Sequence, residues 1–149
     1  MEQTLRTAVF PGTFNPFTIG HKSIVERGLE IFDKIVIAIG HNMTKPVDEN
    51  IVKRVEAIKK AFEGNSRVEV SVYPGLTATY AASIGADAIL RGVRNITDFE
   101  YERNLADINK NILGMETVFL LSLPEYSYIS SSMVRELEAN GHDITPFLP

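Results

Sequence analysis

A short apolar run and the loop behind it read Thr7-Ala-Val-Phe-Pro-Gly-Thr-Phe-Asn-Pro-Phe-Thr-Ile-Gly-His21. The apolar run predicts a first β-strand, and the loop leads into a helix. Gly12 and Gly20 let the backbone approach a ligand closely, while Thr13 offers a hydroxyl and His21 an imidazole at the mouth of the helix. The loop is neither a Walker loop nor the G-x-G-x-x-G dinucleotide fingerprint. It is a candidate phosphate site of another kind.

Beyond this loop, short β-branched runs alternate with segments of helical period, which is the rhythm of a parallel α/β sheet. We therefore predict a single Rossmann-like α/β domain over residues 1–149, with a five-stranded parallel sheet and helices on both faces. The expected strands are residues 7–10, 35–39, 68–72, 88–90 and 118–121, and the expected helices are residues 24–32, 51–62, 79–84, 98–112 and 131–139.

Two helical segments carry clear local signals. Ile51, Val55, Ile58 and Phe62 recur at helical spacing, which predicts one apolar side packed on the sheet. The segment Thr97-Asp-Phe-Glu100 has the form of a capping box, so we expect it to begin the long helix and residues 92–96 to form a short loop.

Composition narrows the class of protein. The chain has 149 residues, of which 44% are hydrophobic, and a net charge of -4. An acidic chain of this size fits one globular domain and argues against a role centred on nucleic-acid binding. There is no cysteine, so disulfides and thiolate metal sites are excluded. No apolar signal core or membrane-spanning run occurs, so we expect a soluble, cytoplasmic protein that does not bind membranes.

Several loops should meet at one edge of the sheet, because parallel strands present their carboxyl ends together and α/β folds bind ligands there. In this acidic chain Lys45, Arg91, Arg94 and His21 are expected to converge at that edge, which favours a polyanionic ligand. The loops are residues 11–21, 40–46, 91–94 and 126–132, the last leading into a helix whose free amides could hold an anion.

Each of these residues also has a simpler interpretation. His21 alone could be a surface residue at a helix start, and Arg91 alone a solvated strand end. The serines at 130–132 could serve only as a helix cap. Glu102 could simply lie on the face of the long helix.

Five motifs, taken together, resemble a known family. Thr18-Ile-Gly-His21 has the T-x-G-H form of the H-x-G-H signature, and Ile129-Ser-Ser-Ser132 with Arg135 resembles the I-S-S-[ST]-x-x-R signature of nucleotidyltransferases with a dinucleotide-binding-like fold. Pro11-Gly-Thr-Phe-Asn-Pro16, Arg91-Gly-Val-Arg94 and Asp98-Phe-Glu-Tyr-Glu102 are similar to bacterial phosphopantetheine adenylyltransferases. The resemblance runs from about Arg6 to Pro149, in motif order and spacing.

This resemblance implies an activity and a set of residues. The family transfers the adenylyl group of ATP to 4'-phosphopantetheine, giving dephospho-coenzyme A and pyrophosphate, and its members are usually magnesium-requiring hexamers. His21 would stabilise the transition state of an in-line attack, and no residue would be dedicated to holding the metal. ATP would be bound by Thr13, Phe14, His21, Gly92, Val93, Arg94, Glu102, Tyr126, Ser127, Tyr128, Ile129, Ser130, Ser131 and Ser132, and the acceptor by Thr13, Lys45, Thr77 and Arg91.

The chain departs from the family pattern at two acceptor positions. Residues 43–46 hold one lysine, Lys45, where many relatives have two, and Thr77 replaces a residue that is often aliphatic. Two rival functions remain open on the same scaffold: a sister transferase that uses CTP or another acceptor, and a non-catalytic nucleotide sensor.

Overall fold

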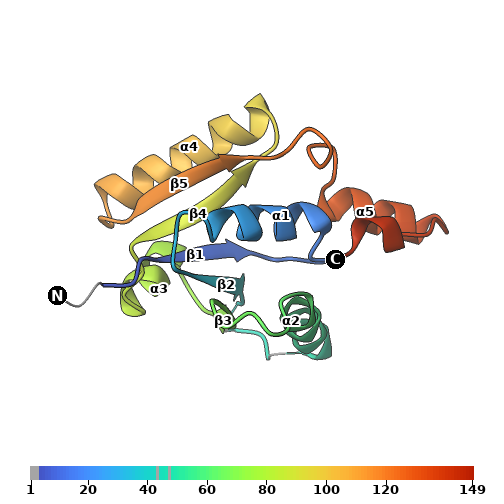
Figure 1. The fold of residues 1–149 in the computed structure, drawn as a ribbon, viewed down its shortest axis with the longest axis horizontal. Coiled ribbons are helices and arrows are strands. Elements are labelled where there is room, and N and C mark those ends of the chain that lie inside the picture. Colours follow the sequence, from blue (N-terminus) through green and yellow to red (C-terminus); the bar gives the residue numbers. More distant parts are fainter. Residues whose placement is uncertain (1–3, 43, 47) are drawn as a thin grey trace.

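A computed structural model describes residues 4–42, 44–46 and 48–149. Its centre is a five-stranded parallel sheet with the order β3-β2-β1-β4-β5 (Figure 1). The predicted fold class is therefore confirmed. The strands are β1 (Thr7–Gly12), β2 (Lys34–Gly40), β3 (Val68–Tyr73), β4 (Ala88–Val93) and β5 (Glu116–Leu121).

Five α-helices and one short 3-10 helix connect or follow the strands. They are α1 (Ile19–Gly28), α2 (Glu49–Ala61), α3 (Thr77–Ser83), α4 (Ile96–Asn111), α5 (Ser131–Ala139) and η1 (Thr145–Phe147). None of the helices in the described part of the chain is long and apolar enough to cross a membrane.

The larger part of the core lies between the sheet and helices α1 and α2. Phe10 of β1 and Ile37 of β2 are buried there with Ile24 of α1 and Ile58 of α2. The predicted apolar stripe of α2 supplies this contact, since three of its four members are buried and Val55 is partly buried. The alternation of side chains along a strand sends the neighbours of these residues to the opposite face.

Helices α3 and α4 cover that opposite face. Val9 of β1 and Ile89 of β4 pack with Ala81 of α3. Phe99 of α4 meets Phe119 of β5 with ring centroids 5.9 Å apart. Helices thus lie on both faces of the sheet, as predicted.

The start of α4 differs from the sequence prediction. The helix begins at Ile96, and Asn95 caps it by accepting a hydrogen bond from the Asp98 amide at 2.9 Å. Thr97 lies inside the first turn, so the predicted capping box at residues 97–100 is wrong. Asn95, two residues before the predicted cap, satisfies a free amide of the first turn instead.

The end of β4 also differs. Arg91, Gly92 and Val93 pair with Phe119, Leu120 and Leu121 of β5, so they belong to the strand rather than to a loop. The ladder with β5 continues three residues beyond the apolar run that signals the strand in the sequence. This extension sets the direction of Arg91 by the pleat of the sheet.

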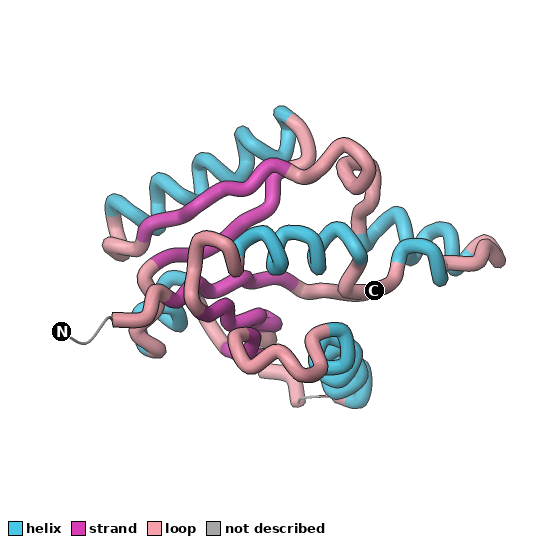
Figure 2. Tube along the Cα trace, viewed as in Figure 1, coloured by secondary structure: helices cyan, strands magenta, loops and turns pink. Residues whose placement is uncertain are grey.

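The carboxyl ends of the strands share one edge, as the parallel topology requires. Figure 1 shows α5 lying beyond this edge, past the end of β1. Figure 2 shows the long connection from β5 crossing toward α5 on the same side of the molecule. The loops that follow β1, β4 and β5 therefore meet there.

Candidate functional site

A cavity of about 340 Å³ opens at this edge of the sheet. Its walls come from the β1–α1 loop, α1, the end of β4, α4 and the segment that leads into α5. Twelve of the residues predicted to bind ATP or the acceptor line it: Thr13, Phe14, His21, Arg91, Gly92, Arg94, Glu102, Tyr126, Ile129, Ser130, Ser131 and Ser132. Tertiary folding thus gathers segments up to 119 residues apart, from Thr13 to Ser132, around one space.

His21 is held in a defined orientation by the start of α1. Its Nδ1 accepts the backbone N–H of Thr18 at 3.0 Å, and the Thr18 hydroxyl lies 3.2 Å from the same nitrogen. The His21 amide in turn donates to the Thr18 hydroxyl at 3.3 Å, which completes a capping box. Because Nδ1 acts as an acceptor, the neutral ring carries its proton on Nε2.

The surroundings of His21 also keep the ring uncharged. Burial, together with the positive charges of Arg91 and Arg94, lowers the pKa of His21 from 6.5 to about 4. The rings of Phe14 and Phe17 lie with centroids 5.0 and 5.3 Å from the imidazole. His21 therefore offers the cavity a neutral Nε2–H donor at pH 7.

Arg91 is tied to a partner that sequence analysis does not identify. Its Nε and Nη2 donate to the two carboxylate oxygens of Glu102 at 2.8 and 2.6 Å, and its Nη1 donates to the Pro11 carbonyl at 2.7 Å. Glu102 is buried, and the bidentate pair with Arg91 compensates its negative charge. The one signal in the sequence is an arginine that follows the apolar run Ala88–Leu90 directly and needs a partner.

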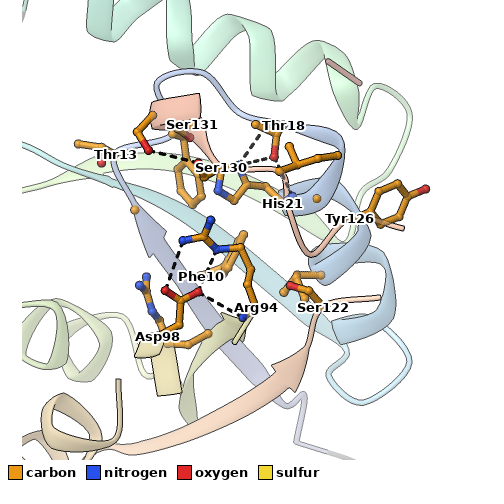
Figure 3. Close-up of a pocket in the computed structure, with 18 of the residues that line it drawn as sticks. Phe10, Thr13, Thr18, His21, Arg94, Asp98, Ser122, Tyr126, Ser130 and Ser131 are labelled. Carbon is orange, nitrogen blue, oxygen red and sulfur yellow. Dashed lines mark hydrogen bonds and ion pairs between the residues drawn. The ribbon is translucent and has the colours of Figure 1, made fainter. Parts of the chain in front are cut away.

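Arg94 forms a second ion pair at the same cavity. Its Nε donates to Asp98 at 2.9 Å, and both side chains appear among the cavity residues in Figure 3. Asp98 is part of a family motif, but the sequence assigns it no role in the site.

The serine segment joins α5 to the β1–α1 loop. Ser130 caps α5 by accepting the Met133 amide at 3.1 Å, and all three serines also line the cavity. Ser131 donates its hydroxyl to the Pro16 carbonyl at 2.8 Å. Ser127 and Tyr128 do not line the cavity, whereas Ser122, which the sequence did not single out, does.

A second, smaller cavity of about 190 Å³ lies on the other side of the Arg91–Glu102 pair. The predicted acceptor residue Thr77 lines it, and its hydroxyl lies 2.7 Å from that of Tyr73. Its other walls include Tyr101, Leu105 and Asn109 of α4. The two cavities share Pro11, Gly12, Arg91 and Glu102.

Besides Ser127 and Tyr128, two more predicted residues, Lys45 and Val93, lie outside both cavities. Lys45 is exposed, and its carbonyl accepts a hydrogen bond from His41 Nε2 at 2.7 Å. Val93 is buried in the sheet beneath the site. Met43, which precedes Lys45 in the second loop, lies outside the described residues. The expected convergence of basic groups thus holds for Arg91, Arg94 and His21 but not for Lys45.

Comparison with known proteins shows the family of the chain. A sequence model of the cytidylyltransferase-like family matches residues 9–137. The phosphopantetheine adenylyltransferase of Phocaeicola vulgatus is 50% identical over 145 residues, which cover 97% of this chain and 96% of that protein. The chain belongs to the phosphopantetheine adenylyltransferase family. The Bacteroides fragilis member is 46% identical over the same share of this chain and 97% of its own length.

Solved structures support the fold of this family member at a greater distance. A bifunctional NMN adenylyltransferase/ADP ribose pyrophosphatase from Francisella tularensis, complexed with AMP and a manganese ion, superposes on 97% of the chain with a TM-score of 0.59 and 17% identity. The NadR protein in complex with NAD and AMP-PNP gives a TM-score of 0.61 and 13% identity. The chain spans less than half of the length of these two proteins, which therefore show the shared fold alone.

Proposed function

We propose that the protein transfers the adenylyl group of ATP to 4'-phosphopantetheine, reversibly, giving dephospho-coenzyme A and pyrophosphate. The observation that carries the proposal is the neutral Nε2–H donor of His21, held by Thr18 in a cavity that Arg91 and Arg94 also line. Family membership identifies the two substrates, and the cavity supplies the chemistry that their reaction needs.

The nucleophile is the terminal phosphate of the acceptor. Its second pKa is about 6, so it is largely ionised at neutral pH and needs no general base. The obstacle is the repulsion between this dianion and the triphosphate of ATP. Catalysis then depends on holding the two phosphates in line and on offsetting their charge.

His21 acts where negative charge develops. In-line attack at the α-phosphorus increases the charge on its non-bridging oxygens, and a fixed N–H donor meets that charge without reorganisation. Because its pKa is about 4, His21 does this by donating a hydrogen bond rather than as a cation. The capping box at Thr18 fixes which ring nitrogen points away from the helix end.

We assign ATP to the larger cavity and the pantetheine arm to the smaller one. The larger cavity holds most of the residues predicted for ATP, and Thr77 lines the smaller one. Arg91 and Glu102 form the shared wall, so the two phosphates would meet beside them. Lys45, on the exposed second loop, would approach the acceptor from outside.

Magnesium belongs to the ATP substrate in this proposal. The two carboxylates that line the larger cavity, Asp98 and Glu102, are both occupied by arginines. Among the described residues, no group of three or more histidines and carboxylates is placed to hold a metal ion. The metal would be carried by the phosphates of ATP and would offset part of their charge.

We also propose a cytoplasmic homohexamer, the assembly that the family resemblance implies. Support for self-association comes from α4, which exposes large apolar side chains along its length. Four of them, Tyr101, Leu105, Ile108 and the C-cap residue Ile112, form a row at spacings of four, three and four residues, and Ile96 and Phe99 are exposed in the first turn. A row of this kind is typical of a surface that another protein covers.

The decisive experiment is release of pyrophosphate by the purified protein with MgATP, with and without 4'-phosphopantetheine, and identification of dephospho-coenzyme A by mass. Release that requires both substrates supports the proposal. A parallel panel with CTP and with other phosphate acceptors tests the sister-transferase alternative. ATP binding without any product would instead favour the sensor function.

A further inference from the structure

Side chains from three elements donate to carbonyl oxygens at the end of β1 and in the loop between β1 and α1. Arg91 of β4 contacts the carbonyl of Pro11 at 2.7 Å, and Arg135 of α5 contacts that of Asn15 at 2.5 Å. Between these two, Nη1 of Arg54 in α2 donates to the Thr13 carbonyl at 2.6 Å. The end of β1 and the loop that carries Thr13 and Phe14 into the larger cavity are thus held at alternate residues by guanidinium groups.

Arg54 differs in its electrostatic balance from Arg91 and Arg94, two of the three arginines that line the cavity. Arg91 and Arg94 are each paired with a carboxylate, which cancels much of their charge. None of the ion pairs within the described ranges 4–42, 44–46 and 48–149 includes Arg54. Its positive charge is therefore uncompensated directly behind the loop.

The position of Arg54 makes this charge effective. The residue is half-buried, and its Nε is buried without a hydrogen-bond partner. A charge that is partly shielded from water is screened less than one on the open surface. Arg54 does not line the larger cavity, so it acts on a ligand there through the loop and through its field rather than by contact.

We infer that Arg54 is a positioning residue, which fixes the β1–α1 loop through its hydrogen bond to the Thr13 carbonyl. Its uncompensated positive charge also attracts the polyphosphate that binds in front of that loop. This inference rests on the proposed function, because it takes the triphosphate of ATP as the ligand of the larger cavity. No motif marks Arg54 in the sequence, where it stands on an ordinary amphipathic helix.

The test is the affinity for MgATP of three variants, measured by titration calorimetry. Arg54→Met removes both the donor and the charge and should raise the Kd about tenfold, as expected for the loss of a close charge interaction. Arg54→Gln keeps a donor without the charge and should fall between Arg54→Met and the parent protein. Arg54→Lys keeps the charge and one donor and should restore the Kd to within about threefold of the parent.

Arg67 offers a matched control. It also holds backbone carbonyls, those of Phe32 at 2.9 Å and Asp33 at 2.8 Å, but in the turn before β3 and away from the site. Arg67→Met should lose thermal stability and keep the parent's Kd for MgATP. The salt dependence of the Kd should also become shallower in Arg54→Met and stay unchanged in Arg67→Met, because only the former loses a charge beside the ligand.

Two results would overturn the inference: an unchanged Kd in Arg54→Met, or an equal loss in Arg67→Met, which would mean general loosening of the fold. Failure of the proposed function has a different signature. In that case the parent protein binds MgATP but releases no pyrophosphate with 4'-phosphopantetheine, and the ranking of the Arg54 variants still decides the inference. A parent protein with no measurable affinity for MgATP would refute the role of Arg54 as well.

Discussion

The contacts around His21 define its chemistry more closely than the motif does. A T-x-G-H sequence places a histidine at a helix start, but it does not say which nitrogen carries the proton. The backbone N–H of Thr18 settles this, because it can only donate and therefore requires an acceptor at Nδ1. The same contact opposes protonation of Nδ1, in agreement with the lowered pKa of His21.

Replacing His21 with alanine tests its role in the transition state. A donor aimed at developing charge is typically worth about a hundred- to a thousandfold in kcat. We expect His21→Ala to lose about that much turnover while the KM for ATP changes much less, because the interaction strengthens in the transition state. Steady-state kinetics with both substrates measure the split. Unchanged turnover with weakened ATP binding would assign His21 to ground-state binding, and His142→Ala, on the surface, serves as the control.

The pH dependence of stability gives a second test of His21. Between pH 4 and 6.5 the unfolded chain binds a proton on this histidine that the folded protein does not. Stability should therefore fall as the pH drops from 6.5 to 4, by on the order of 3 kcal/mol from this residue. Denaturant unfolding of the parent and of His21→Gln, which cannot titrate, isolates the contribution as the difference between their pH profiles. Parallel profiles would contradict the lowered pKa.

The start of α4 matters because this helix carries Asp98 and Glu102 to the arginines of β4. Asn95 satisfies the free amide of Asp98, so the cap and the Arg94–Asp98 ion pair share one turn of backbone. We expect Asn95→Ala to lower the free energy of unfolding by about 1 kcal/mol. Thr97→Ala, at the position that the sequence favoured as the cap, should cost clearly less. Urea unfolding at one fixed protein concentration compares the two, and an equal or larger loss in Thr97→Ala would contradict the observed cap.

The exposed apolar row on α4 concerns the molecule as a whole. In a single chain the side chain of Ile108 is 50% exposed, and that of Val52 in α2 is 48% exposed. If α4 lies in a subunit interface, Ile108→Asp should shift the molar mass measured by light scattering toward that of the monomer, because a buried unpaired charge opposes assembly. Val52→Asp, with a similar exposure on another helix, should leave the mass unchanged. A parent protein that is already monomeric would contradict self-association.

Much of the architecture can be predicted from the sequence because its signals are local. The strand runs and the helical spacing of Ile51, Ile58 and Phe62 depend only on neighbours along the chain, and the predicted range of α5 agrees with the structure. Where pairing with another strand extends a strand, the apolar run in the sequence ends before the strand does. Thus β4 runs on through Val93 because β5 supplies hydrogen-bond partners there.

The same distinction between local and tertiary information applies to the candidate site. The motifs locate His21, Arg91 and the serine segment, since each follows a predicted strand, and parallel strands bring their ends together. They cannot give the partners of these groups. Arg54, Arg91 and Arg135 contact the end of β1 and the loop after it across 41, 80 and 120 residues of sequence. These contacts exist only when α2, β4 and α5 are packed around that segment. The sequence thus determines which chemical groups the site contains, because residue type and local periodicity are enough to identify them. Only the folded chain determines which charges are paired and which remain free, because the pairing depends on distances between elements that are remote in sequence.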